Sequence, residues 1–339
     1  MKRREFLGFF AASAITPLLG KSPLAGNGIN EANEAAGANE RPRAIAPPNI
    51  RNITIKLNCE RAFSALHISD THLALVDNRD DERKMKLAAG RVTVFPNAVH
   101  YLDAAISYAR VNRMQLIHTG DLIDFTSEAN FDCASAHIMD GDVMAAAGNH
   151  EFSQYVGEAR EDEAYKQQSR DKVQEVFPND ITFSSRVVNG VNFVAIDDVY
   201  YNVTERQHEL MEQEMKRGLP VVMLCHVPLY TPRHCEYALK NNSAAYLAGV
   251  PLEITSKYPH DSSLAPEEQW RNRDVQQRAD KPTLEFLAWL KEQKLLRAIL
   301  CGHCHYFFED RFSPTAMQYT VGANYNGDAY SIRFEGRTL

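Results

Sequence analysis

The sequence predicts an α/β fold with mixed β-sheets, and two observations support it. Segments with helical spacing and short apolar strands alternate through the first half of the chain. Strand-like runs joined by tight turns appear in the second half. Alternating helices and strands are typical of parallel sheets covered by helices, and hairpins add antiparallel pairs. A sizeable core is expected, because 44% of the 339 residues are hydrophobic and only 24% are charged.

The first half begins with two strands and continues with helices and strands in turn. The run 53–57 alternates apolar and polar residues as a half-buried strand does, and 63–68 is a second strand. Apolar residues recur at helical spacing between 96 and 112, which predicts an amphipathic helix. A strand at 114–118, a helix near 128–139, a strand at 143–147 and a helix near 161–176 complete this half. The charged run 80–84 is interpreted as solvated, on an insertion at the rim.

The second half opens with a predicted hairpin between 181 and 197, because Asn189-Gly190 favours a type I′ turn. A helix near 205–217, a strand at 220–225, a helix at 283–294, a strand at 297–301 and a β-rich end follow. The segment 227–281 is polar and without clear periodicity. A loop of this length is usually functional or disordered, so we interpret it as a cap over the substrate or as a structural surface loop. Its Arg and Tyr side chains are the candidate substrate contacts, namely Tyr230, Arg233, Tyr237, Tyr246, Arg271 and Arg273.

The N-terminus predicts an export signal at residues 1–25. Basic residues precede an apolar run from Phe6 to Leu19, which is too short to span a bilayer. The string Arg3-Arg4-Glu5-Phe6-Leu7 resembles the twin-arginine (Tat) signal; a general secretory signal or a short anchor is the alternative. Residues 26–50 form an expected flexible leader, and 51–339 form the folded domain. The protein is therefore expected to be periplasmic or extracellular, without stable membrane insertion after cleavage.

Charge and cysteine content narrow the function. A net charge of −7 argues against an extended nucleic-acid surface, which needs clustered Lys and Arg. It leaves room for a small phosphorylated substrate, because bound cations supply positive charge locally. Six cysteines in an exported chain suggest disulfides, with Cys225–Cys235 or Cys301–Cys304 as the candidate pairs. A chain of this size does not need such bridges, so we expect mostly free buried thiols.

Five polar motifs each follow a predicted strand. They are Asp70-Thr71-His72, Gly120-Asp121-Leu122-Ile123-Asp124, Gly148-Asn149-His150-Glu151, His226 and Gly302-His303-Cys304-His305. Ligands of open α/β sheets gather beyond the carboxyl ends of the strands, so these side chains should converge. In an extended chain, residues i and i+2 point the same way, which predicts that Asp70 with His72, and His303 with His305, each reach one site. Carboxylate and imidazole groups without thiolates suit Mn, Fe or Zn.

In this order, the motifs resemble those of the calcineurin-like metallophosphoesterase family. The resemblance spans Asp70 to His305 and implies a four-layer α/β/β/α sandwich with two mixed sheets and two divalent metal ions. It implies that Asp70, His72 and His305 hold one metal, that Asn149, His226 and His303 hold the other, and that Asp121 bridges them. His150 would stabilise charge or protonate the leaving oxygen. Asp124 would orient a ligand histidine or His150.

The resemblance implies hydrolysis of phosphate esters by a water that two metals activate, with clamping of the attacking and leaving oxygens. The expected partner is a phosphorylated small molecule, with nucleotides among the candidates. Purple acid phosphatases carry a Tyr where this chain has Asp124, and Ser/Thr phosphatases carry Arg where it has Phe125 and Ala147. Only residues 306–339 remain for the added C-terminal domain of bacterial 5′-nucleotidases. Stand-alone bacterial phosphodiesterases and phosphatases are therefore the best match, and monoester versus diester stays open.

Two other classes of function compete with this interpretation. Some proteins of the same fold have lost their ligands and act as non-enzymatic scaffolds, although the ligand set here is intact. Cys301-Gly302-His303-Cys304-His305 also matches a haem-attachment pattern and a redox dithiol. A redox dithiol normally opens a helix, whereas the following Tyr306-Phe307-Phe308 predicts a strand. We therefore expect these cysteines to be incidental.

Overall fold

The computed structural model describes residues 48–139, 143–158 and 160–336. The expected signal peptide (1–25) and nearly all of the expected leader (26–50) lie outside the described residues. The first strand, β1 (Asn49–Lys56), begins two residues before the predicted start of the folded domain at residue 51.

The first sheet has five strands in the order β1-β11-β2-β3-β4. Its remaining members are β2 (Phe63–Ile68), β3 (Gln115–Thr119), β4 (Val143–Ala146) and β11 (Asp328–Glu335). Strands β2, β3 and β4 run parallel to one another, and β11 pairs antiparallel with β2 and parallel with β1. The parallel strands are short apolar runs because both faces of this sheet are covered.

The second sheet has six strands in the order β5-β6-β7-β8-β10-β9. They are β5 (Phe183–Val188), β6 (Val191–Ile196), β7 (Val221–Leu224), β8 (Leu296–Cys301), β9 (Phe308–Arg311) and β10 (Met317–Thr320). The predicted hairpin joins β5 to β6, and both of its turn residues, Asn189 and Gly190, have the positive φ that a type I′ turn requires. Strands β6, β7, β8 and β10 are parallel, and β9 is antiparallel to β10.

The two sheets pack face to face through alternate side chains of their strands. In β6, Phe193 and Ala195 join the cluster between the sheets, whereas Val194 and Ile196 point into the opposite cluster. The cluster between the sheets also contains Ile117 of β3 and Tyr330 of β11. Because successive side chains of a strand point to opposite faces, half of the side chains of β6 lie between the sheets and half face the outer helices.

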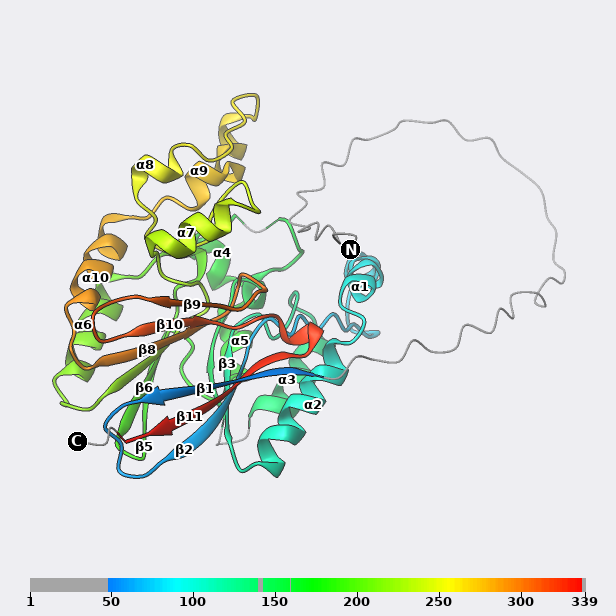
Figure 1. Ribbon diagram of the computed structural model, residues 1–339. Coiled ribbons are helices and arrows are strands. Elements are labelled where there is room, and N and C mark those ends of the chain that lie inside the picture. Colours follow the sequence, from blue (N-terminus) through cyan, green and yellow to red (C-terminus); the bar gives the residue numbers. More distant parts are fainter. Residues whose placement is uncertain (1–47, 140–142, 159, 337–339) are drawn as a thin grey trace, which may run out of the picture. The chain divides into compact units, whose positions relative to one another are not determined.

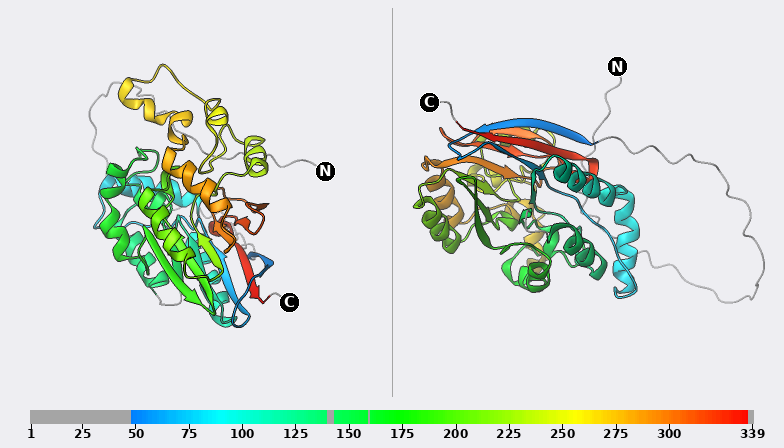
Figure 2. Two further views of the ribbon diagram at one scale, coloured as in Figure 1. Left: turned by 90° about the vertical axis from the view of Figure 1, so that its left-hand side faces the viewer. Right: turned by 90° about the horizontal axis from the view of Figure 1, so that it is seen from below.

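Helices cover the two outer faces (Figures 1 and 2). Helices α2 (Ala98–Val111), α3 (Glu128–Ile138) and α5 (Arg170–Glu175) pack on the first sheet. Helices α6 (Glu205–Met215) and α10 (Lys281–Lys291) pack on the second and lie on the side away from α2 and α3. The predicted four-layer α/β/β/α arrangement with two mixed sheets is confirmed.

Several local predictions were wrong or incomplete. The helix expected near 161–176 is two short helices, α4 (Glu163–Gln167) and α5, because the chain breaks at the buried Ser169. The charged run 80–84 begins a helix, α1 (Glu82–Val94), whose N-cap is the side chain of Asp81. One-turn 3₁₀ segments also occur at His150–Phe152, Val199–Tyr201 and Asn324–Asn326.

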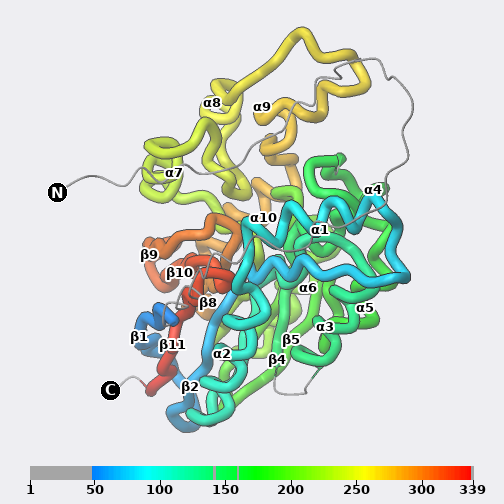
Figure 3. Tube along the Cα trace, turned by 90° about the vertical axis from the view of Figure 1, so that its right-hand side faces the viewer, coloured from blue at the N-terminus to red at the C-terminus, as the bar shows by residue number. Residues whose placement is uncertain are grey.

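The cap, residues 227–281, contains helices too short to show periodicity in the sequence. They are α7 (Pro232–Leu239), α8 (Leu252–Thr255), the 3₁₀ segment Pro266–Arg271 and α9 (Arg273–Gln276). Helix α7 begins with Thr231 as N-cap and Pro232 in its first turn, which is a local start signal. In Figures 1 and 3 the cap lies at one end of the domain, away from α2.

Candidate dimetal centre

The motif residues lie where the parallel strands end. Asp70 follows β2, Asp121 follows β3, and Asn149 follows β4 in the first sheet. His226 follows β7 and His303 follows β8 in the second. Because β2, β3 and β4 run parallel in the first sheet, and β7 and β8 in the second, the loops that follow these strands leave each sheet at the same edge.

A first group of ligand-type atoms comprises Asp70, His72, Asp121 and His305, which lie within 4.8 Å of one another. His305 Nε2 is 3.2 Å from Asp70 Oδ1 and 3.1 Å from His72 Nε2. Asp121 Oδ2 is 3.7 Å from His72 Nε2. Only His305 among these side chains is appreciably exposed, at 24%. Two carboxylates and two imidazoles thus face one point.

A second group comprises Asp121, His226 and His303. Asp121 Oδ2 is 3.3 Å from His226 Nε2, which in turn is 3.2 Å from His303 Nδ1. The carboxylate of Asp121 therefore belongs to both groups. It is the position that can bridge two cations.

Asn149 is placed beside this carboxylate by its neighbour. The backbone N–H of His150 donates to Asp121 Oδ1 at 2.9 Å. The side-chain oxygen Oδ1 of Asn149 is buried and has no hydrogen-bond partner among the described residues. A buried amide oxygen without a partner is costly, so an unfilled acceptor at this position fits a metal ligand.

The donor set fits divalent cations. Imidazole nitrogens that approach to 3.1–3.2 Å in two places repel each other when both are unprotonated, unless a cation lies between them. Burial lowers the pKa of His303 to about 3, which keeps its imidazole neutral as a ligand must be. Burial opposes protonation of His226 too, but the charge of Asp121 raises the pKa of His226 to about 10. Asp121 therefore attracts positive charge to this point.

Each ligand-type histidine is oriented through its other ring nitrogen. His226 Nδ1 donates a hydrogen bond to the carbonyl of Thr119 at 2.7 Å, so Nε2 is the ring nitrogen that faces Asp121 and can bind a metal. His72 Nδ1 lies 3.0 Å from Asp124 Oδ1. The hydroxyls of Tyr325 and Tyr201 lie 3.2 Å from His305 Nδ1 and 3.3 Å from His303 Nε2. Such outer contacts fix the tautomer and direction of a ligand ring. Neither tyrosine was predicted, because no sequence spacing links either one to its histidine.

Glu151 was quoted in a motif but given no role, and the structure shows one. Its buried carboxylate accepts the backbone N–H groups of Asp121 (2.8 Å), Leu122 (2.6 Å), Ile123 (3.2 Å) and Gly148 (2.5 Å). Burial, together with the nearby charge of Asp121, raises the pKa of Glu151 to about 7. Glu151 therefore holds the loops after β3 and β4 together.

Asp124 and His150 lie beside the first group and form with His72 a third group of ligand-type atoms. His150 Nδ1 is 2.8 Å from the carbonyl oxygen of Asp124 and 3.2 Å from its carboxylate Oδ1. Burial acts to lower the pKa of His150, but the charge of Asp121 and the contacts with Asp124 raise the pKa to about 9. Burial also disfavours ionisation of Asp124, yet hydrogen bonds from Arg91, His150 and His72 hold the pKa of Asp124 well below its usual range.

The backbone that presents the ligands is not extended. Asp70, His72 and Asp121 have φ of 56°, 53° and 54°, and His303 and His305 have φ of 66° and 56°. The prediction that residues i and i+2 converge assumed an extended chain, and that assumption was wrong. Asp70 and His72 do meet in one group, whereas His303 and His305 turn to different groups.

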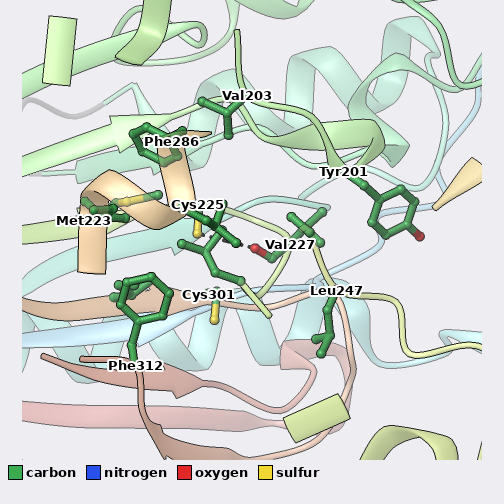
Figure 4. Packing of buried hydrophobic residues seen from close by; sticks show 14 of the residues in the cluster. Tyr201, Val203, Met223, Cys225, Val227, Leu247, Phe286, Cys301 and Phe312 are labelled. Atoms are coloured by element: carbon green, nitrogen blue, oxygen red, sulfur yellow. Dashed lines mark hydrogen bonds between the residues drawn. The ribbon is translucent and has the colours of Figure 1, made fainter. Parts of the chain in front are cut away.

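No cysteine belongs to either group of ligand-type atoms among the described residues. All six are free. Cys225 and Cys301 pack among apolar side chains such as Val227 and Phe312 (Figure 4), and the Cys225 thiol donates to the Val227 carbonyl at 3.5 Å. Burial raises the pKa of Cys304 to about 12. A thiolate is the reactive form, so these thiols are poorly suited to redox chemistry.

The cap residues divide into two sets. The ring of Tyr246 lies 6.2 Å from that of His303, and the guanidinium of Arg273 lies 5.5 Å from the Tyr246 ring centre. Tyr237 packs on Tyr306, and Arg233 lies over Phe308. Arg271 contacts Trp270 and Glu268, and Tyr230 lies beside Lys291. Among the six candidates, Tyr246 and Arg273 thus approach the second group of ligands.

Comparison with known proteins decides the family. A model of the calcineurin-like phosphoesterase family matches residues 63–313. The chain belongs to the calcineurin-like phosphoesterase family. The predicted metal-dependent hydrolase is thereby confirmed, and the family and the two His/Asp groups together indicate a dimetal centre. No curated protein matches the chain.

Solved structures with similar folds are distant in sequence. A dimetal phosphatase from Danio rerio is 15% identical, with 79% of this chain and 89% of that chain covered and a TM-score of 0.46. A putative 5′-nucleotidase from Staphylococcus aureus is 13% identical (78% and 49% covered, TM-score 0.38). A phosphopantetheinyl hydrolase from Mycobacterium tuberculosis is also 13% identical (79% and 92% covered, TM-score 0.37). At these scores the family assignment rests on the family match and the motif geometry. Among the described residues, no helix is long and apolar enough to cross a bilayer.

Proposed function

We propose that this calcineurin-like phosphoesterase is an exported hydrolase of small phosphate esters that works with two divalent cations. The observation that carries the proposal is the position of Asp121, whose carboxylate is shared by two separate groups of ligand-type atoms. Asp70, His72 and His305 would hold one cation, and Asn149, His226 and His303 the other. When bound, the cations supply a water of lowered pKa and neutralise charge on the phosphate oxygens. Mn, Fe and Zn all suit these oxygen and nitrogen donors.

His150 would supply the proton for the leaving oxygen. Its Nδ1 is engaged by Asp124, so Nε2 is left for the substrate. A pKa of about 9 keeps the imidazole protonated at neutral pH, as a general acid requires. Asp124 would hold both His150 and His72 in position, since its Oδ1 contacts both rings.

The substrate would be a phosphorylated small molecule, with nucleotides among the candidates, and Arg273 of the cap would contact a part of it beyond the scissile phosphate. Arg273 stacks on Tyr246, donates a hydrogen bond to Gln276 and lies near enough to Glu161 to interact with its charge, but it forms no ion pair among the described residues. An arginine in this state is available for an anionic or planar group. The proposed periplasmic or extracellular location rests on the N-terminal Arg3-Arg4 signal. Retention in the cytoplasm of chains with both arginines changed to lysine would support it, and continued export would contradict it.

Asp121→Asn tests the function directly. We expect the variant to lose bound metal and to lose more than about 100-fold in kcat, because changing an outer contact of a metal ligand already costs 10–100-fold. Asp103→Asn is the matched control, since Asp103 lies on α2 with 60% of its side chain exposed, pairs with His137 and belongs to neither ligand group. Metal content and hydrolysis of p-nitrophenyl phosphate and bis-p-nitrophenyl phosphate would be measured with added Mn²⁺ or Zn²⁺. Comparison of the two esters separates monoesterase from diesterase activity. A wild-type chain that binds metal but hydrolyses neither ester nor any nucleotide would refute the proposal.

A further inference from the structure

One arginine outside all the motifs contacts the candidate centre. Arg91 lies in the last turn of α1, in the long segment between His72 and Asp121. Its Nε donates to Asp124 Oδ2 at 2.5 Å and its terminal nitrogen donates to Asp124 Oδ1 at 2.8 Å. The pair is therefore bidentate, which fixes the plane of the carboxylate as well as its position.

Asp124 depends on this contact. Its carboxylate is fully buried, and its Oδ1 is already shared by His72 Nδ1 at 3.0 Å and His150 Nδ1 at 3.2 Å. Arg91 Nε is the partner of Oδ2 among the described residues. Removal of Arg91 would leave a buried carboxylate oxygen unpaired, so the carboxylate would rotate towards another partner. That rotation would release the rings of His72 and His150.

Arg91 supports the same rings by a second route. Its guanidinium carbon lies 4.8 Å from the centre of the Phe95 ring. Phe95 stacks on His72 with centroids 4.6 Å apart and an interplanar angle of 14°. Phe95 also packs at 4.6 Å against Tyr325, whose hydroxyl lies 3.2 Å from His305 Nδ1. Phe95, which Arg91 touches, thus supports His72 directly and His305 through Tyr325.

We propose that Arg91 is a positioning residue of the metal centre, which acts through Asp124 and Phe95 on His72, His305 and His150. The inference rests on the proposed function, because it assumes that His72 and His305 hold a cation. The competing explanation is that Arg91 merely fastens α1 to the domain. Helix α1 buries Ala88, whereas its larger apolar side chains Met85, Val92 and Val94 are exposed. Apolar packing therefore holds α1 weakly, and its ion pairs would matter for its attachment.

Arg83 on the same helix separates the two explanations. Arg83 pairs with Glu158 and lies 3.9 Å over the ring of Tyr155. It therefore fastens the other end of α1 and touches no residue of the centre. Arg83→Ala loosens the helix without disturbing Asp124, whereas Arg91→Ala does both.

The experiment measures Mn²⁺ affinity of the full chain by competition with a chelator, together with thermal unfolding in EDTA and steady-state kinetics. We expect Arg91→Ala to weaken Mn²⁺ binding by about 10–100-fold, as other outer contacts of metal ligands do. Arg91→Lys should fall between this variant and the wild type, because an ammonium cannot bind both oxygens in a planar fork. The fall in kcat should be larger than the rise in KM, because Asp124 would no longer hold the His150 ring in its position for the transition state. Arg83→Ala should bind Mn²⁺ as the wild type does.

Two results would overturn the inference. One is an Arg91→Ala chain, or an Arg91→Lys chain if the alanine variant does not fold, whose Mn²⁺ affinity equals that of the wild type. The other is an Arg83→Ala chain that loses as much affinity as Arg91→Ala, since docking of α1 would then be the whole effect. A wild-type chain that binds no Mn²⁺ or Zn²⁺ would instead overturn the proposed function itself and this inference with it.

Discussion

Gly148→Ala should damage the metal centre through a single methyl group. A Cβ at Gly148 would lie 2.3 Å from Asp121 Oδ1 and 2.4 Å from the Asp121 backbone nitrogen, where ordinary contacts begin at 3.4 Å. The two loops would therefore have to separate by about 1 Å. They cannot do so freely, because Glu151 accepts the N–H groups of Gly148 and Asp121 at 2.5 and 2.8 Å.

The magnitude follows from that geometry. Overpacking of a tightly packed site costs about 1–3 kcal/mol, and a weakened hydrogen bond to Glu151 adds about 1 kcal/mol. We expect the free energy of unfolding in EDTA to fall by about 2–4 kcal/mol. For a domain of this size, each kcal/mol lowers Tm by roughly 2–4 °C. Because the methyl group displaces the carboxylate that both ligand groups share, Mn²⁺ binding should weaken as well.

Gly90→Ala is the control for Gly148→Ala. Gly90 lies inside α1, and a Cβ there meets nothing within 4 Å. The same substitution should stabilise the chain by about 0.5–1 kcal/mol, because alanine is the better helix former. Urea unfolding and chelator competition would measure both variants. A Gly148→Ala chain with wild-type stability and wild-type Mn²⁺ affinity would refute the close contact from which the effect is derived.

Cys304, Arg273 and His234, a buried residue of α7 that contacts Tyr306, should respond differently to substitution. Cys304→Ala should keep metal and activity, because the half-buried thiol contacts the carbonyl of Tyr246 and belongs to neither ligand group; loss of activity with the fold intact would contradict this. Arg273→Ala should raise KM with little change in kcat, and steady-state kinetics with an unchanged KM for every ester would count against a substrate contact. His234→Gln should flatten the pH dependence of stability: burial lowers the pKa of folded His234 to about 4, so the unfolded chain takes up the proton first. The wild type should thus lose on the order of 3 kcal/mol relative to the variant as pH falls from about 6.5 to 4, and parallel urea-unfolding curves would exclude it.

The strands and the order of the motifs could be predicted from the sequence because their signals are local. Apolar runs such as 114–118 and the Asn189-Gly190 turn fix their structure within a few residues. The ligands follow strand ends, so predicting the strands also predicted where Asp121 and His226 would converge. Assignment of particular residues to particular metals came from the family resemblance and remains a proposal.

The contacts that support the ligands could not be predicted, because they join residues with no common pattern. Arg91 and Asp124 are brought together by α1, a predominantly polar helix whose one buried residue is Ala88. Tyr201 and Tyr325 reach His303 and His305 from loops after different strands. Sequence periodicity reports which face of an element is buried, and it carries no information on which loop side chain meets another.

The left-handed backbone at the ligands explains why reasoning from an extended chain failed there. Five non-glycine residues with φ near +55° to +65° cost on the order of 1 kcal/mol each, which local preference alone would avoid. The conformation persists because tertiary hydrogen bonds impose it: Asp70 N–H donates to the Gly120 carbonyl, and His72 N–H donates to the Asp121 carbonyl, both at 2.9 Å. His303 N–H donates to the Asp70 carboxylate at 2.9 Å, so the same carboxylate that faces the centre also holds the opposite loop. The two sheets therefore store strain at one shared edge, and cations bound there would be stabilised by a ligand set that is already in place before they arrive.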